Sequence, residues 1–179
     1  KSRGGEEKFH EAVVDHRNGS NTRTFREVTA LGKRLERISD SVYHTCNRPK
    51  VAILFDWENW WAVEGIQGPR KDMAYVSTIL SHYKPFWELG IDVDFISEED
   101  TMEGYRLVVA PMAYMYKEGY ADRVEEFVKK GGVYVATYFS GVVDDSDLCI
   151  LGSHPLEKVL GIRPEEMDAA TQYQPNSIS

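Results

Sequence analysis

The sequence predicts an α/β fold, in which an open, mostly parallel sheet carries helices on both faces. Two observations lead to this fold class. Segments with helical periodicity alternate with short runs of β-branched and aromatic residues throughout residues 51–139. The connections between these segments are short, as is typical of βαβ units in doubly wound folds.

The first predicted element is a long amphipathic helix. Apolar residues recur every three or four positions over residues 25–42, and residues 24–27 match a capping box, so we expect the helix to begin there. The polar stretch 44–50, which contains Pro49, is typical of a linker. A domain boundary is therefore predicted between residues 1–46 and residues 48–179.

The remaining elements alternate between strand and helix. Gly90 stands where a helix C-cap glycine belongs, and Gly131 and Gly132 close a later helix. The segment that contains the three clustered tryptophans is predicted as a loop. Strands are predicted over residues 51–55, 91–96, 107–110 and 133–139, and helices over residues 73–87 and 120–128.

Aromatic residues follow three of the predicted strands. In an open parallel sheet, the loops that carry function cluster at the carboxyl ends of the strands. The first of these loops contains Trp57, Trp60 and Trp61, the second covers residues 111–116, and the third follows Phe139. Such side chains can close the domain's own core, line a ligand pocket, or form a surface that meets another subunit.

Composition argues against several classes of partner. The formal net charge is −8 and the basic residues are scattered, so we expect no nucleic acid as a partner. No apolar stretch approaches the roughly 18 residues of a membrane-spanning helix, so we expect no membrane partner. Cys46 and Cys149 are the two cysteines, too few for a disulfide framework, which favours a reducing, cytoplasmic location.

Three kinds of site fit these loops poorly. A flavodoxin-like nucleotide site needs a small, glycine-rich loop after the first strand, where this chain has Asp56 followed by a tryptophan and a second acid. An amidotransferase-like enzyme needs a cysteine at a strand-to-helix turn, but residues 111–113 contain none, and Cys149 is expected to be a buried small hydrophobe. The acidic run 144–147 lacks the glycine and glutamate of a calcium loop. We expect no catalytic residue, no cofactor and no metal.

Three stretches of the sequence carry a family resemblance. The stretch VAILFDWENWWA, together with GGEEKFH and LEKVLGIRPEEMDA, resembles the β-galactosidases of glycoside hydrolase family 42. The resemblance implies that residues 1–46 are the C-terminal remnant of a catalytic (β/α)₈ barrel. It implies that residues 48–179 are a trimerisation domain with a class I glutamine amidotransferase-like fold that has lost catalytic function. Both catalytic glutamates of these retaining enzymes would precede Lys1, so the fragment alone is expected to be inactive.

The resemblance also implies partners and site residues. The intact enzyme would be a homotrimer that hydrolyses terminal β-D-galactosides. Glu7 and His10 match family positions that hydrogen-bond hydroxyls of the bound galactosyl unit, and would orient the sugar without cleaving it. The cluster of Trp57, Trp60 and Trp61 would fill a neighbouring subunit's surface, with the adjacent carboxylates accepting its hydrogen bonds, or one tryptophan would stack on sugar.

Two readings from other classes stay open at this point. One is a stand-alone amidotransferase-like hydrolase with an unusual nucleophile, for which rapid alkylation of Cys149 at neutral pH would be the signature. The other is a carbohydrate-binding module that uses the tryptophans as a platform, which predicts that the isolated chain binds galactosides.

Overall fold

The computed structural model describes residues 3–9, 12–69 and 73–167, and it divides into two compact units, Lys1–Asn47 and Arg48–Ser179. The first unit contains a short 3₁₀ helix, η1 (Glu6–Phe9), an isolated bridge between Asp15 and Gly19, and the helix α1 (Arg23–Val42). The expected barrel strand near the N-terminus is not formed, since residues 6–9 are helical. A strand needs a neighbour to pair with, and the described part of this unit supplies none there.

Helix α1 begins two residues earlier than the capping box predicted. Thr22 is the N-cap, and its hydroxyl accepts a hydrogen bond from the Phe25 N–H at 3.1 Å. Glu27, expected to close the capping box, instead pairs with Arg23 one turn before it. The sequence offered two threonines, and the earlier one satisfies the free N–H groups of the first turn.

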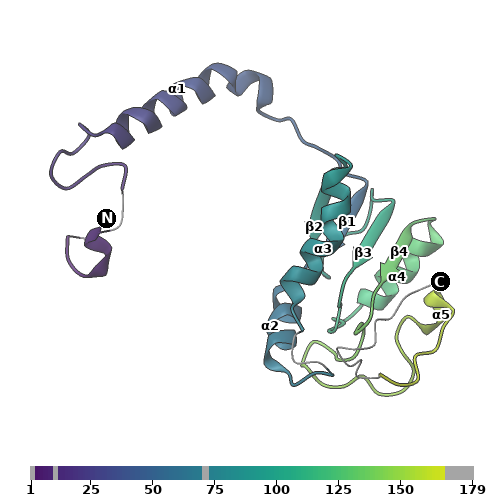
Figure 1. Cartoon of the computed structure of the whole chain (residues 1–179). Helices are drawn as coiled ribbons and strands as arrows, with labels where there is room; N and C mark the ends of the chain where they lie inside the picture. Colours follow the sequence, from purple (N-terminus) through teal and green to yellow (C-terminus); the bar gives the residue numbers. More distant parts are fainter. Residues whose placement is uncertain (1–2, 10–11, 70–72, 168–179) are drawn as a thin grey trace. The chain divides into compact units, whose positions relative to one another are not determined.

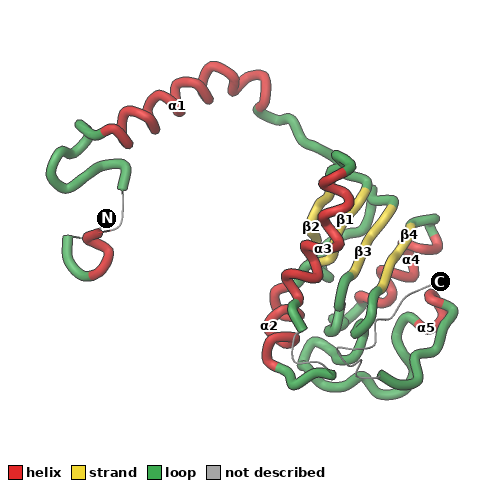
Figure 2. Tube along the Cα trace, in the orientation of Figure 1, coloured by secondary structure: helices red, strands yellow, loops and turns green. Residues whose placement is uncertain are grey.

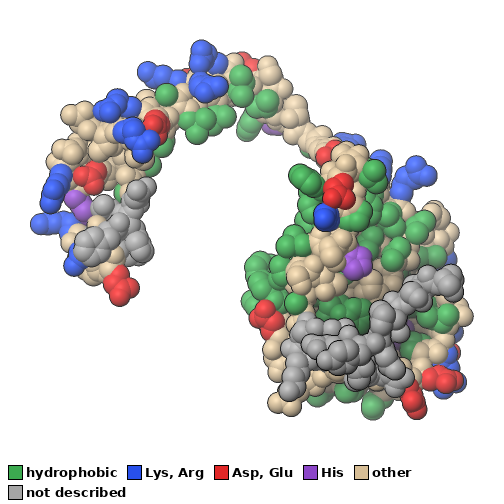
Figure 3. Space-filling view, in the orientation of Figure 1, with side chains coloured by type: hydrophobic (Ala, Val, Ile, Leu, Met, Phe, Trp, Pro, Cys, Tyr) green, Lys and Arg blue, Asp and Glu red, His purple; other side chains and the backbone are tan. Residues whose placement is uncertain are grey.

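The apolar stripe of α1 is exposed along its whole length. No residue of the helix is buried, and Figure 3 shows its hydrophobic side chains gathered along one side. A helix with so pronounced an apolar side normally packs that side against a core. The exposed members of the stripe are Val28, Leu31, Leu35, Ile38 and Val42.

The second unit is built on a four-stranded, all-parallel sheet (Figures 1 and 2). Its order is β2-β1-β3-β4, so the chain moves to one side of β1 and then crosses back to the other. In register, Val51 lies opposite Val93 on one side and Leu107 on the other, and Leu107 lies opposite Val133. The strands are β1 (Val51–Leu54), β2 (Val93–Ile96), β3 (Leu107–Ala110) and β4 (Val133–Ala136).

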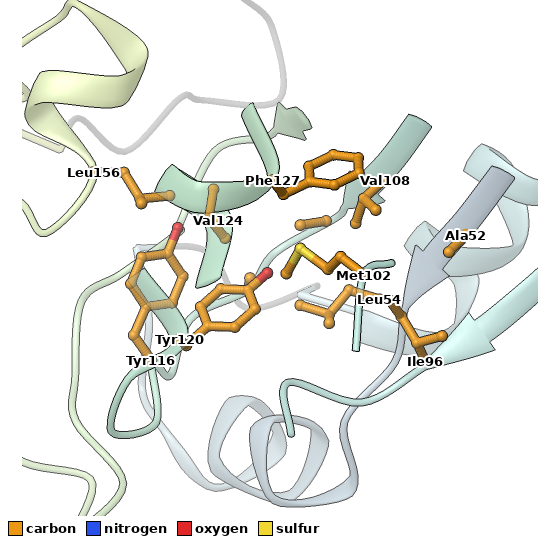
Figure 4. Packing of buried hydrophobic residues seen from close by; sticks show 12 residues of the cluster. Ala52, Leu54, Ile96, Met102, Val108, Tyr116, Tyr120, Val124, Phe127 and Leu156 are labelled. Carbon is orange, nitrogen blue, oxygen red and sulfur yellow. The ribbon is translucent and has the colours of Figure 1, made fainter. Parts of the chain in front are cut away.

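Helices cover both faces of the sheet, as the sequence predicted. The helices α2 (Trp57–Gly65) and α3 (Tyr75–Glu88) pack on the face to which Ile53 points, and α4 (Tyr120–Lys129) packs on the face of Ala52 and Leu54. Figure 4 shows the packing beneath α4, where Val124 and Phe127 meet the strands. A last short helix, α5 (Glu157–Leu160), follows. These apolar faces are the reason that each strand is nearly all hydrophobic.

The main departure from the predicted elements is α2. Residues 57–65 form a helix where a loop was expected, because Asp56 caps it and because the tryptophans carry no periodicity that marks an amphipathic helix. Helices α1, α3 and α4 and the four strands agree with prediction to within three residues at their ends, whereas η1 and α5 were not predicted. Gly90, just after α3, has a φ of 67°, the left-handed conformation expected of a glycine at that position.

Candidate functional site: the carboxyl edge of the sheet

The carboxyl edge of the sheet is where the loops that follow β1, β3 and β4 come together. Because successive strands are added on one side of β1 and then on the other, the switch point lies between β1 and β3, where doubly wound folds usually open a ligand crevice. Here the crevice is filled by side chains. Residues 111–116 are buried, and so are Asp56 and Asn59 from the β1 side.

Asp56 is used entirely inside the domain. Its Oδ1 accepts hydrogen bonds from the Glu58 and Asn59 N–H groups at 3.0 and 3.1 Å, which fixes the first turn of α2. Its Oδ2 accepts a hydrogen bond from the Lys117 Nζ at 2.9 Å. The sequence-based expectation that Asp56 reaches a neighbouring subunit is therefore wrong, since the carboxylate is buried with both oxygens bound.

Lys117 holds the two acids at the start of α2 together. Its ammonium group contacts both Asp56 and Glu58, and its side chain is only 13% exposed. Burial alone would lower the pKa of Lys117, but the hydrogen bonds to Glu58 and Asp56 raise it above its ordinary value. The lysine therefore stays charged and anchors α2 to the loop after β3.

Glu98 is a buried carboxylic acid at this edge. It is 1% exposed, and its Oε2 accepts a hydrogen bond from the Lys117 backbone N–H at 2.7 Å. Within the described residues, its Oε1 has no hydrogen-bond partner. Burial raises the pKa of Glu98 to about 8, and the neighbouring Asp56 charge acts in the same direction. The carboxyl group is therefore mostly protonated at neutral pH.

Asn59 ties α2 to the turn after β3. Its Nδ2 donates to the Met112 carbonyl at 3.0 Å, and its Oδ1 accepts from the Met115 N–H at 2.9 Å. Met112 itself has a φ of 47°, which is strained for a residue with a side chain. The Met112 N–H donates to the Thr137 hydroxyl at 2.8 Å, so that contacts from α2 and from the loop after β4 hold the strained turn.

The strained turn has the position that a nucleophile elbow has in α/β hydrolytic folds, at the end of a central strand. Its residue is Met112, which is fully buried, and the Tyr138 hydroxyl contacts its sulfur at 3.2 Å. A thioether carries no proton to lose and is no nucleophile for acyl transfer. The geometry of the turn is thus used here for packing.

The three tryptophans lie on α2 and are not equivalent. Trp57 and Trp61 are exposed, at 57% and 61%, whereas Trp60 is half-buried and its indole N–H donates to Glu64 at 2.6 Å. The Trp57 ring lies 5.2 Å from Trp60 and 6.3 Å from Trp61. The Phe55 ring packs against this group, and its centroid lies 5.3 Å from that of the Trp57 ring. We call Trp57 and Trp61 the tryptophan surface.

An open, polar cavity of about 650 Å³ lies beside this surface. It is lined mainly by carboxylates, with Lys117 already paired to two of the acids near it. An acidic lining disfavours phosphates and other anionic ligands. The lining residues are Glu58, Glu99, Lys117, Glu118, Arg123, Asp145 and Ser146.

The remaining sequence-based candidates are Glu7, His10, Cys149 and the acidic run 144–147. The Glu7 backbone belongs to η1 and its side chain is not described, and His10 lies outside the described residues. Cys149 is exposed, which corrects the prediction that it is a buried hydrophobe, because its loop runs over the surface. The Asp144 carboxylate accepts hydrogen bonds from the Ser146 and Leu148 N–H groups, as in a turn.

Two absences hold for the part of the chain that the structure describes. Among residues 3–9, 12–69 and 73–167, no three His, Cys, Asp or Glu side chains form a group that could hold a metal ion. Over the same residues, no helix combines the length and the apolar character needed to cross a bilayer.

Sequence reasoning missed the buried polar groups Asn59, Glu98 and Lys117. None of the three belongs to a repeating apolar pattern, so periodicity does not mark it as buried. One signal was available for Asn59. It stands three residues after an aspartate that follows a strand, a spacing typical of the first turn of a helix.

Fold and site together define a doubly wound α/β domain whose carboxyl edge is closed by packing and carries exposed tryptophans. The chain belongs to the family described as the beta-galactosidase trimerisation domain, whose model matches residues 49–179. A second model, described as beta-galactosidase, matches residues 1–38.

Similar proteins are much longer than this chain. Beta-galactosidase Pbg of Clostridium perfringens is 49% identical over all of this chain, which spans 26% of that protein. Beta-galactosidase BglY of Alicyclobacillus acidocaldarius is 48% identical over 94% of the chain, which spans 25% of it. The crystal structure of beta-galactosidase from Bacillus circulans sp. alkalophilus matches 97% of the chain and 26% of its own length, with 41% identity and a TM-score of 0.82. The chain thus spans about a quarter of the length of each of these relatives.

Proposed function

We propose that residues 48–179 assemble three copies of a β-galactosidase and that the tryptophan surface is part of the contact between them. The observation that carries the proposal is the pair of exposed tryptophans on a helix whose first turn is fixed by a buried ion pair. Large aromatic side chains on a rigid support are the usual anchors of protein interfaces. The description of the matched family, a trimerisation domain, supports the same assignment.

We further propose that residues 1–46 complete the catalytic domain of that enzyme. The family match over residues 1–38 supports this assignment, and so does the exposed apolar stripe of α1, which the rest of a barrel would cover. On this account the chain alone does not hydrolyse a β-galactoside. Two exposed, unpaired cysteines suit the reducing conditions of the cytoplasm.

The tryptophan surface is tested by truncation in the full-length protein. Trp57→Ala and Trp61→Ala should each weaken assembly more than tenfold, because losing a central interface tryptophan commonly costs about 2 kcal/mol or more. Sedimentation velocity over a dilution series measures the shift toward smaller species. Trp60→Ala is the matched control on the same helix, and it should lower the melting temperature more than it weakens assembly, since Trp60 is half-buried and bonded to Glu64.

Two results would argue against this role. If both exposed-tryptophan variants assemble as the wild type does but melt earlier, the side chains serve the domain's own stability. If they assemble normally but show a raised KM for galactosides, then the tryptophans contact sugar instead.

Glu7 and His10 are proposed to hydrogen-bond the galactosyl unit in the intact enzyme. Glu7→Ala or His10→Ala should each lower kcat/KM by roughly ten- to a thousand-fold, because contacts to sugar hydroxyls strengthen toward the transition state. Steady-state kinetics on a chromogenic β-galactoside measure the effect, and far-UV circular dichroism should be unchanged. Unaltered kinetics in both variants would remove the two residues from the sugar site.

A further inference from the structure

Helix α3 carries two apolar stripes. The first faces the sheet and contains the buried residues Tyr75 and Ile79. The second contains Val76, Leu80, Tyr83 and Trp87, at steps of four, three and four residues, which places them in one row along the helix. We call this second row the α3 outer stripe. A helix that is apolar over more than its core-facing side has a second surface to cover.

The outer stripe is partly open to solvent and continues onto the sheet edge, with Val76 and Tyr83 half-buried. Leu80 is 55% exposed and Trp87 is 66% exposed. The Tyr83 ring lies 5.7 Å from Phe95 of β2, which is itself half-exposed. Because β2 is an edge strand of the described sheet, the stripe and Phe95 form one apolar surface along that edge.

The outer side of α4 has the reverse character. Between Ser97 and Gly132, a segment that is described throughout, no large hydrophobic side chain is exposed. The outer side of α4 instead carries the ion pairs Glu125–Lys129 and Glu126–Lys130. Figure 3 shows hydrophobic side chains gathered over α2 and α3. The helices on the two faces of the sheet thus differ in the side chains that they expose.

Charge reinforces this difference. Residues 48–179 contain 12 Lys and Arg against 22 Asp and Glu, a net charge of −10. Three such domains repel one another, so their contacts are most favourable where acidic residues are sparse. Helices α2 and α3 expose four large hydrophobic side chains beside the acids Glu58, Glu64 and Glu88, whereas residues 97–132 contain eight acids and expose no large hydrophobic side chain.

We propose that the α3 outer stripe is the second half of the subunit contact and receives the tryptophan surface of a neighbouring copy. The inference rests on the proposed function. A closed ring of three needs two different patches on each subunit, so that one meets the other around the ring. The tryptophan surface lies at the carboxyl edge of the sheet and the outer stripe lies along the β2 edge, so the two patches point in different directions.

The description of the matched family, a trimerisation domain, favours another copy of this chain as the occupant.

The test compares two variants of the full-length protein, each with one arginine introduced on a different side of α3. Leu80→Arg should weaken assembly more than tenfold, because a buried interface would have to accept an unpaired charge. Ser81→Arg is the matched control, since Ser81 is exposed on the polar side of α3, and it should assemble as the wild type does. Sedimentation velocity over a dilution series compares the two, and circular dichroism checks that both are folded.

A mixing experiment tests the pairing of the two patches. Subunits with Leu80→Arg keep an intact tryptophan surface, and subunits with Trp61→Arg keep an intact outer stripe. An equimolar mixture should therefore form a one-to-one dimer that neither variant forms alone. Wild-type assembly by Leu80→Arg, or a mixture that stays monomeric, overturns the inference. If Trp61→Arg also assembles normally, the proposed function fails as well, so the two failures are distinguishable.

Discussion

At the scale of single residues, the carboxyl edge depends on an acid held away from water. At neutral pH the Glu98 carboxyl group is ionised when the chain is unfolded and mostly protonated when it is folded. The reason is that burial raises its pKa from 4.5 to about 8. Folding therefore takes up a proton between these pH values. The contribution of Glu98 to stability is fully present below its unfolded pKa of 4.5 and is lost as the pH rises through 8.

Glu98→Gln tests this protonation. The amide keeps an acceptor for the Lys117 N–H and cannot ionise, so the free energy of unfolding of the variant should depend less on pH. At about pH 9 the variant should be more stable than the wild type by on the order of 1 to 3 kcal/mol, and at about pH 5 the two should be similar. Urea unfolding at both pH values measures this. Glu99→Gln, at the exposed neighbouring residue, is the control. An equal change in its free energy of unfolding would contradict the account.

At the scale of elements, α2 is held by polar contacts more than by its own apolar side. Only Asn59 and Val63 of the helix are buried, and its start is fixed by the Asp56 cap and by Lys117. The asparagine then connects the helix to the turn at Met112. The exposed tryptophans thus stand on an element that the buried polar groups position.

Asn59→Ala should destabilise the protein by about 2 to 4 kcal/mol, because it leaves the buried Met115 N–H without its acceptor and removes a donor from the Met112 carbonyl. Thermal or urea unfolding measures the loss. Glu88→Ala, which breaks an exposed ion pair with Lys84, is the control and should change stability by less than about 0.5 kcal/mol. Comparable effects from both variants would show that the Asn59 contacts add little.

The elements that sequence patterns predicted well are those with a strong period or a glycine signal. Helices α3 and α4 and all four strands fall in this group, because a face that packs on a core leaves a repeat in the sequence. Helix α2 does not, since Trp57 and Trp61 are exposed and its buried positions are few. The tryptophans were found as a cluster, but their unequal exposure depends on Phe55 and Glu64, which only the structure shows to be their partners.

At the scale of the whole molecule, the chain spans about a quarter of the length of the relatives it matches. Its first unit presents an apolar stripe on α1 with no described partner surface within that unit, and its second unit exposes large aromatic side chains on α2 and α3 and ion pairs on α4. The resemblance to β-galactosidases led to the family, and the family matches over residues 1–38 and 49–179 agree with it. The arrangement of three copies depends on surfaces that have no partner inside one chain, and sequence periodicity cannot reveal it.

The central claim is that the α2–α3 face, and not the α4 face, meets a neighbouring subunit. It is tested most directly by placing the photo-crosslinking residue benzoylphenylalanine at position 61 or at position 122 of the full-length protein. Both Trp61 and Asp122 are exposed in one chain, on α2 and α4 respectively. Irradiation of the position 61 variant should give covalent species of two and three subunits, and mass spectrometry should find the linked peptide in or beside α3. Crosslinks between subunits from position 122, with none from position 61, would contradict the account.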